Sequence, residues 1–180
     1  MDVVERAKNI ILTPKAEWPV IATEANSIEA IYSDYLVYIA AVPAIASFVG
    51  FALTGVTGFF SGLVWSVANY VLSLVVVYVV ALIINKLAPS FDGIANFLNA
   101  FKLAAYSTTA AWLAGVFSLA PPLAFLGLLG VLYTYYLLYL GLPVLMLSPD
   151  SKSLLYTCAV IVVSLVIQLL IAWILWHIFF

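Results

Sequence analysis

A chain of 180 residues that is 67% hydrophobic and 8% charged cannot be an ordinary soluble domain, because such domains average roughly 45–50% apolar and 25% charged residues. The net charge of −2 and the absence of a basic run give no support for nucleic-acid binding. Cys158 is the single cysteine, which excludes an internal disulfide and a cysteine-based metal cluster. The composition therefore predicts an integral membrane protein.

The first 33 residues are expected to form a cytoplasmic, interfacial segment ahead of a membrane domain at 34–180. Asp2–Leu12 has the pattern of an amphipathic helix, with valine, alanine and isoleucine on one face and Arg6 and Lys8 on the other. Such a helix lies in the membrane interface rather than crossing it. A second short helix is predicted to begin at Pro14. The residues expected to make cytoplasmic contacts are Lys15, Glu17 and Trp18.

Charged residues are absent from three long tracts, Tyr35–Asn85, Leu103–Pro149 and Ser153–Phe180. A helix needs about 20 residues to cross a bilayer, so the tracts have room for two, two and one spans. We therefore predict an all-α integral membrane protein with five transmembrane helices. The expected spans are about 35–53, 63–84, 103–119, 123–147 and 154–176.

The stretch Phe101–Gly115 has the features of a helix at the centre of the bundle. Small residues recur at every fourth position along two lines, which are adjacent stripes of one helix face at 3.6 residues per turn. Such stripes allow neighbouring backbones to approach closely, within the monomer or between copies. The two lines are Ser107, Ala111, Gly115 and Ala110, Ala114, Ser118.

The basic residues predict the orientation of the chain in the membrane. Five spans would place the N-terminus, the loop at 85–102 and the turn at 148–153 on one side. All six basic residues belong to these segments. Because cytoplasmic loops carry the excess of Lys and Arg, the N-terminus is expected in the cytoplasm and the C-terminus outside.

No catalytic arrangement is recognisable in the chain. The predicted spans contain no carboxylate, so acid–base pairs and metal sites would have no such ligands there. His177 is the single histidine and lies between aromatic residues near the end of the chain, which is typical of an interfacial position. We therefore expect no enzymatic activity, no cofactor and no metal.

Uncharged polar side chains inside the predicted spans have two alternative roles. They can hydrogen-bond between helices, each contributing about 0.6–2 kcal/mol, or they can line a polar cavity for a solute or a lipid headgroup. Asp34 and Lys102 are a candidate ion pair at the cytoplasmic mouth. The residues predicted for a polar core or binding site are Asn69, Tyr106, Ser107, Thr108, Tyr136 and Gln168.

Three stretches form a recognisable pattern: ILTPKAEWPVIATE, FKLAAYS and WLAGVFSLAPPLAFLGLLGVLYTYYLLYLGLPVLM. With the residues around them, they resemble the compact prokaryotic branch of the Yip family (Ypt-interacting proteins) over nearly the whole chain. The resemblance implies five spans, a cytoplasmic N-terminus and a bacterial cytoplasmic (inner) membrane. Eukaryotic members reside in Golgi and endoplasmic-reticulum membranes and bind Rab GTPases. Their long soluble N-terminal region is not found in this sequence, so GTPase binding has little support here.

The sequence favours a non-enzymatic membrane scaffold or adaptor that acts through protein or lipid interactions. Its expected partners are the lipid bilayer, other membrane or cytoplasmic proteins, and a second copy of the chain. The alternative is a transporter or channel for a small solute or lipid, with the uncharged polar residues as its pathway. A hydrated core would distinguish the transport function from the scaffold function.

Overall fold

The computed structural model describes the backbone of residues 2–55 and 58–179; for Pro121, Gln168 and residues 170–179 it describes the backbone alone. The described residues form helices and short connections, and no strand occurs among them. The predicted all-α architecture is therefore confirmed. Within this described part, four helices are long and apolar enough to cross a membrane, namely Ile28–Thr54, Phe59–Phe91, Pro122–Leu145 and Asp150–Ile167.

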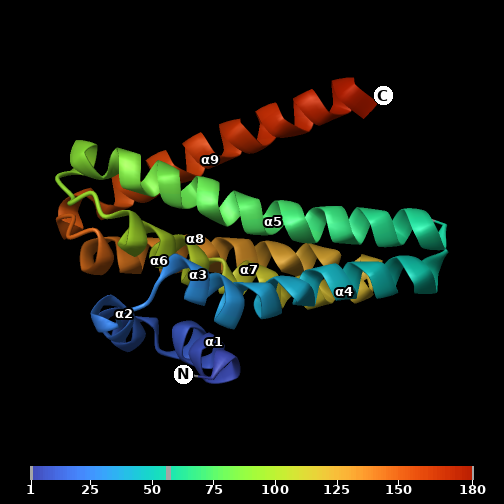
Figure 1. Cartoon of the computed structure of the whole chain (residues 1–180), viewed down its shortest axis with the longest axis horizontal. Helices are drawn as coiled ribbons and strands as arrows, with labels where there is room; N and C mark the ends of the chain where they lie inside the picture. The colour runs from blue at the N-terminus through green and yellow to red at the C-terminus, as the bar shows by residue number, and fades with distance from the viewer. Residues whose placement is uncertain (1, 56–57, 180) are drawn as a thin grey trace.

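The first two long helices form an antiparallel pair (Figure 1). The first combines α3 (Ile28–Ile31), a π-helical turn η1 (Tyr32–Leu36) and α4 (Val37–Thr54). The second is α5 (Phe59–Leu87), which ends in the 3-10 turn η2 (Ala88–Phe91). These two helices contain the predicted first and second spans, 35–53 and 63–84. They are longer than predicted, because the helical structure continues beyond the apolar residues on which the predictions were based.

The predicted third span is not one continuous helix. It consists of α6 (Phe97–Ser107), α7 (Thr109–Ala114) and the 3-10 turn η3 (Gly115–Leu119). At the break, the Thr108 hydroxyl donates a hydrogen bond to the carbonyl oxygen of Ala104 at 2.6 Å, a contact that often bends helices. The division into short pieces explains why this segment is not among the four long helices.

The last two long helices complete the bundle. The 3-10 turn η4 (Pro121–Leu126) leads into α8 (Gly127–Leu145), which packs against α6 and α7. The final helix, α9 (Asp150–Phe179), begins beside η2 and the end of α5 (Figure 1). Successive segments therefore run in alternating directions along the bundle.

The stretch Phe101–Gly115, which runs through α6 and α7, lies at the centre of the bundle, as the sequence predicted, whereas η3 after it has no buried residue. Residues 100–107 are all buried. A Cβ atom added to Gly115 would lie 2.5 Å from Cβ of Pro43 in α4. One added to Gly130 in α8 would lie 2.7 Å from the carbonyl oxygen of Ala110 and would also overlap Ala114. The small-residue lines therefore allow close packing within the monomer.

The N-terminal helices α1 (Val3–Leu12) and α2 (Pro14–Thr23) lie against one side of the bundle and contact α6, α7 and α8 (Figure 1). The bounds of α1 agree with the predicted helix. The placement of Arg6 on its exposed polar face is wrong, because Arg6 is only 4% exposed. It is buried together with carboxylates that pair with it.

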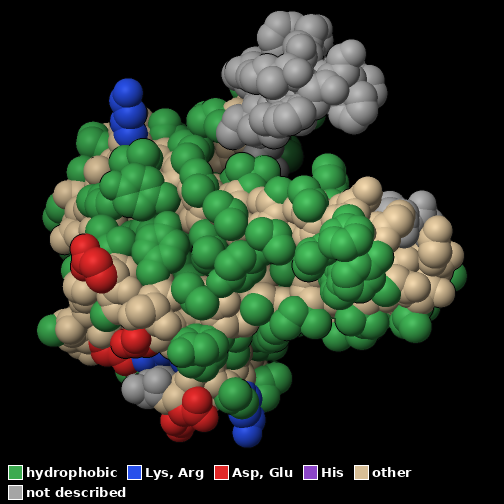
Figure 2. All heavy atoms as spheres, turned by 45° about the vertical axis from the view of Figure 1, so that its right-hand side comes forward, with side chains coloured by type: hydrophobic (Ala, Val, Ile, Leu, Met, Phe, Trp, Pro, Cys, Tyr) green, Lys and Arg blue, Asp and Glu red, His purple; other side chains and the backbone are tan. Residues whose placement is uncertain are grey.

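Charge and apolar surface are separated along the molecule. Hydrophobic side chains cover most of the face shown in Figure 2, and the charged side chains visible there gather toward one end. The turns at this end include Lys86, Asp92, Asp150 and Lys152, whereas residues 54–55, 58–59 and 115–127 at the other end contain no charged residue. This distribution is typical of a multi-pass membrane protein.

Candidate functional site

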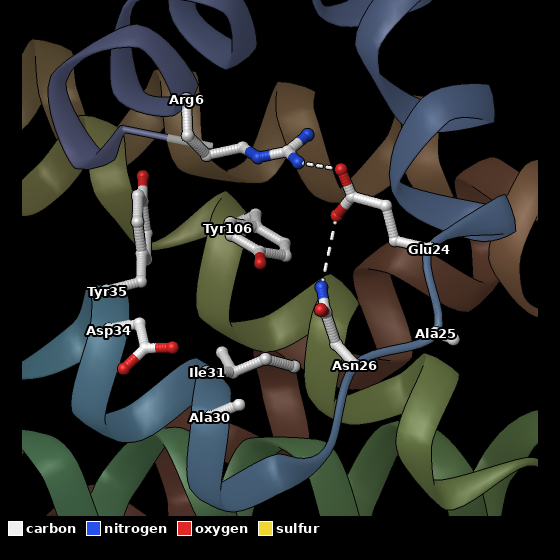
Figure 3. Close-up of a pocket in the computed structure, with 9 residues that line it drawn as sticks. All are labelled: Arg6, Glu24, Ala25, Asn26, Ala30, Ile31, Asp34, Tyr35 and Tyr106. Carbon is white, nitrogen blue, oxygen red and sulfur yellow. Dashed lines mark hydrogen bonds and ion pairs between the residues drawn. The ribbon is translucent and has the colours of Figure 1, made fainter.

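A cavity of about 330 Å³ lies at the charged end of the bundle. Its walls come from α1, the connection between α2 and α3, the turn η1, and α6, so segments distant in the sequence meet there (Figure 3). Six of its nine lining residues are polar. Its polar lining residues are Arg6, Glu24, Asn26, Asp34, Tyr35 and Tyr106.

Arg6 is the central cation of this site. Its guanidinium is paired with the carboxylates of Glu17 and Glu24, and the side chains of Arg6 and Glu17 are 4% and 7% exposed. The guanidinium carbon also lies 5.4 Å from the centroid of the Tyr106 ring, within the range of a cation–π interaction. An unpaired buried charge costs several kcal/mol, so separating Arg6 from its carboxylates is unfavourable. The ion pairs therefore hold α1 against α2, and the contact with Tyr106 joins both to α6.

Lys102 fastens the end of α2 to α6. Its ammonium donates hydrogen bonds to the carbonyl oxygens of Ile21 at 2.9 Å and Glu24 at 2.6 Å. These carbonyls belong to the C-terminal end of α2, where backbone acceptors lack helical partners and favour a cation.

The predicted ion pair between Asp34 and Lys102 is not formed. The ammonium of Lys102 is buried against α2, and it does not reach out to the membrane surface. Asp34 is exposed in η1, and its carboxylate accepts a hydrogen bond from the hydroxyl of Ser33 at 2.7 Å. Asp34 therefore lines the cavity as a carboxylate without a cationic partner among the described residues.

Tyr35 connects the cavity to the centre of the bundle. Its hydroxyl lies 2.7 Å from Oγ1 of Thr109 in α7, and either hydroxyl can donate the hydrogen bond. Its ring meets that of Tyr106 edge to face, with centroids 4.9 Å apart and an interplanar angle of 60°. The two tyrosines therefore join η1 to α6 and α7 beneath Arg6.

Replacing Tyr35 with Phe is expected to lower the free energy of unfolding by about 1–3 kcal/mol, because the buried hydroxyl of Thr109 loses its partner. Thr109→Val should have a similar effect, and the double variant should cost less than the sum of the two. Denaturant unfolding in mixed micelles measures this coupling. Tyr38→Phe, at a tyrosine that is 60% exposed, is the matched control. Additive losses would contradict the hydrogen bond.

Comparison with known proteins identifies the family of the chain. A family model described as the Yip1 domain matches residues 8–174. The chain belongs to the Yip1 domain family. The inner membrane protein YohC of Escherichia coli strain K12 is 28% identical over 172 residues, with 88% of each chain covered. YohC of strain O6:H1 gives the same values, and no solved structure gives a significant match.

These matches confirm the Yip-family resemblance predicted from the sequence. They also agree with the apolar helices in identifying a multi-pass membrane protein similar to a bacterial inner membrane protein. The cavity residue Arg6 lies just before the matched Yip1 region, whereas Glu24, Asp34 and Tyr106 lie within it. Among the described residues, no group of three His, Cys, Asp or Glu side chains is placed to hold a metal ion.

The residues predicted for a polar core are not brought together in the Yip1-domain bundle. Asn69 faces outward on α5, where its amide donates to the carbonyl oxygen of Trp65 at 2.8 Å. Tyr136 is 42% exposed on α8. Both side chains lie on the outer faces of their helices, so the prediction of a core position is wrong for both. The side chain of Gln168 lies outside the described residues.

The other three residues of the predicted polar core lie together where α6 ends and α7 begins. Tyr106 and Ser107 are buried at the end of α6, and Thr108 bonds to its own helix. The Ser107 hydroxyl has no hydrogen-bond partner among the described residues. Of these three, only Tyr106 lines the cavity.

The three residues predicted to contact cytoplasmic partners differ in their exposure. Lys15 is exposed. Glu17 is paired with Arg6, and Trp18 is 0% exposed and packs against α8, where an added Cβ on Gly141 would lie 2.8 Å from its ring. Glu17 and Trp18 are therefore not part of an exposed contact surface, and the prediction is wrong for them.

Sequence reasoning missed the network around Arg6. Arg6 is the single arginine in the chain, and arginine is favoured over lysine where a buried cation meets two carboxylates. That preference is the signal that could have identified it. The pairing with Glu17 and Glu24 depends on how α1 and α2 pack, which no local spacing specifies.

Proposed function

We propose that this Yip1-domain chain is a non-enzymatic membrane scaffold or adaptor. The observation that carries the proposal is the buried network of Arg6, Glu17 and Glu24. It attaches α1 and α2 rigidly to the bundle, so these helices present a fixed surface. A fixed surface suits a protein that holds lipids or other proteins in place, since little conformational entropy is lost on binding.

The exposed face of α1 and α2 has the chemistry expected of such a contact surface. It combines basic groups with large apolar side chains that are not buried by the bundle. This combination favours the headgroup region of a membrane or an amphipathic partner, because the apolar groups gain contacts while the cations stay solvated. The residues are Lys8 and Lys15 together with Val4, Leu12 and Val20.

The scaffold function is favoured over transport by the partners of the polar groups inside the bundle. Thr134 accepts a hydrogen bond from the backbone amide of Ala111 at 3.2 Å, and Tyr35 and Thr109 bond to each other. The cavities between α4 and α5 and between α5 and α9 are lined almost entirely by apolar side chains. A continuous polar pathway would need free hydrogen-bonding groups along its length.

The proposed orientation places the N-terminus in the cytoplasm and the C-terminus on the other side, in a bacterial inner membrane. It requires α6, α7 and η3 to act together as the third of five crossings. Support comes from the basic residues, all six of which belong to the segments assigned to the cytoplasmic side. It also comes from the packing of α6–α7–η3 alongside α4 and α8.

Single-cysteine labelling tests both parts of the proposal. In a Cys158→Ala background, cysteines replace Ser151 at the start of α9, Ser61 near the start of α5, and Thr134 in α8. A membrane-impermeant maleimide is then added to right-side-out and inverted vesicles. We expect Ser151→Cys to react only from the cytoplasmic side, Ser61→Cys only from the opposite side, and Thr134→Cys from neither.

The two parts of the test fail in different ways. Labelling of Ser151→Cys and Ser61→Cys from the same side would contradict the orientation. It would not contradict the scaffold function, which does not depend on the orientation. Labelling of Thr134→Cys in folded, normally abundant protein would contradict the packed core. It would favour a hydrated transport pathway instead, because maleimide reacts with thiols that water can reach.

A further inference from the structure

The cavity contains an unused hydrogen-bonding group. Tyr106 is 4% exposed, yet its hydroxyl forms no hydrogen bond within the described residues and points into the space between Asp34 and Asn26 (Figure 3). The ring is held from two sides, by the guanidinium of Arg6 and by the edge-to-face contact with Tyr35. The ring is therefore fixed while its hydroxyl faces the cavity, where it is free to bond to a group that enters.

The unpaired charge of the cavity is negative. Arg6 is already shared by two carboxylates, and Lys102 is occupied by backbone carbonyl oxygens. Of the two carboxylates that line the cavity, Glu24 is paired with Arg6, whereas Asp34 accepts only the hydroxyl of Ser33. An anionic ligand would therefore find Arg6 already paired and would be repelled by the carboxylate of Asp34, so binding of an anion is disfavoured.

We propose that this cavity binds a primary ammonium group. The Asp34 carboxylate and the Tyr106 hydroxyl oxygen both line it and can accept N–H donors. A quaternary ammonium group has no N–H to donate and fits less well. The volume of about 330 Å³ is at the small end of ligand sites. The inference does not depend on the scaffold function.

The ammonium group has two sources, the headgroup of an aminolipid or a free amine in solution. Purified full-length protein in detergent distinguishes them. Native mass spectrometry compares short-chain phosphatidylethanolamine, phosphatidylcholine and phosphatidylglycerol with equal acyl chains, and calorimetry measures ethanolamine. Retention of phosphatidylethanolamine over the other two assigns the lipid source. Binding of ethanolamine without that preference assigns the free amine.

Three variants connect the binding to the cavity. Asp34→Asn is expected to weaken binding of the retained amine by about tenfold or more, because a charge-assisted hydrogen bond is lost. Tyr106→Phe should weaken it less, since it removes a hydroxyl and keeps the ring. Glu29→Gln removes an exposed carboxylate in α3 that does not line the cavity and should leave binding unchanged. Thermal unfolding checks that each variant is folded.

Three results would overturn the proposal. One is that neither ethanolamine nor phosphatidylethanolamine binds to the folded protein. Another is a preference for phosphatidylglycerol or inorganic phosphate, which would make the cavity an anion site. The third is equal binding by Asp34→Asn and Glu29→Gln, which would place the amine elsewhere on the molecule.

Discussion

Replacing Arg6 with methionine is expected to lower the free energy of unfolding by roughly 3–5 kcal/mol, the range found when one partner of a buried ion pair is removed. The loss comes from Glu17, whose side chain is 7% exposed and would keep its charge without a cation. Glu24, at 27% exposed, can turn toward water and contributes less. Unfolding of the purified chain in mixed detergent micelles measures the difference.

Two controls separate this effect from a general loss of charge. Lys8→Met removes an exposed cation from the same helix and should change stability little. Adding Glu17→Leu to Arg6→Met removes the stranded carboxylate and should recover part of the loss. Equal stability of Arg6→Met and Lys8→Met would contradict the network.

The membrane fold was predictable because it follows from features that extend over many residues. The charge-free tracts gave the positions of the long helices, and the repeat of small residues identified α6–α7–η3 as the central segment. The contacts of Gly115 with Pro43 and of Gly130 with Ala110 follow from this repeat. The length of an apolar stretch determines where a long helix forms, and the size of its residues determines where helices pack closely. Both can be recognised in a short stretch of sequence.

The site was harder to predict because it depends on single contacts between distant segments. The amphipathic pattern of α1 places Arg6 on its polar face, yet Arg6 is buried against carboxylates and Tyr106, whereas Glu5 and Lys8 of the same face stay exposed. Lys102 was predicted to pair with Asp34, but the end of α2 supplies it with carbonyl acceptors instead. In both cases a polar residue is buried because tertiary packing provides its partners, and helical periodicity carries no information about them.

Replacing Gly130 with alanine is expected to lower the free energy of unfolding by roughly 1–3 kcal/mol, the usual cost of overpacking. The added Cβ would overlap Ala114 and lie 2.7 Å from the carbonyl oxygen of Ala110 and 3.2 Å from Cα of Ala111. Backbone atoms cannot yield as a flexible side chain does, so α8 must move away from α7. Unfolding in mixed micelles and the yield of monodisperse protein measure the effect.

Gly127→Ala is the matched control, because an added Cβ at this position of α8 meets nothing within 4 Å. It should be neutral or stabilising by up to about 1 kcal/mol, since alanine is the better helix former. Ala114→Gly combined with Gly130→Ala should recover only part of the loss, because it removes one overlap and leaves the carbonyl of Ala110 in place. Equal stability of Gly130→Ala and Gly127→Ala would mean that the small-residue lines do not hold α8 within the monomer. Contact between copies would then become the better explanation for those lines.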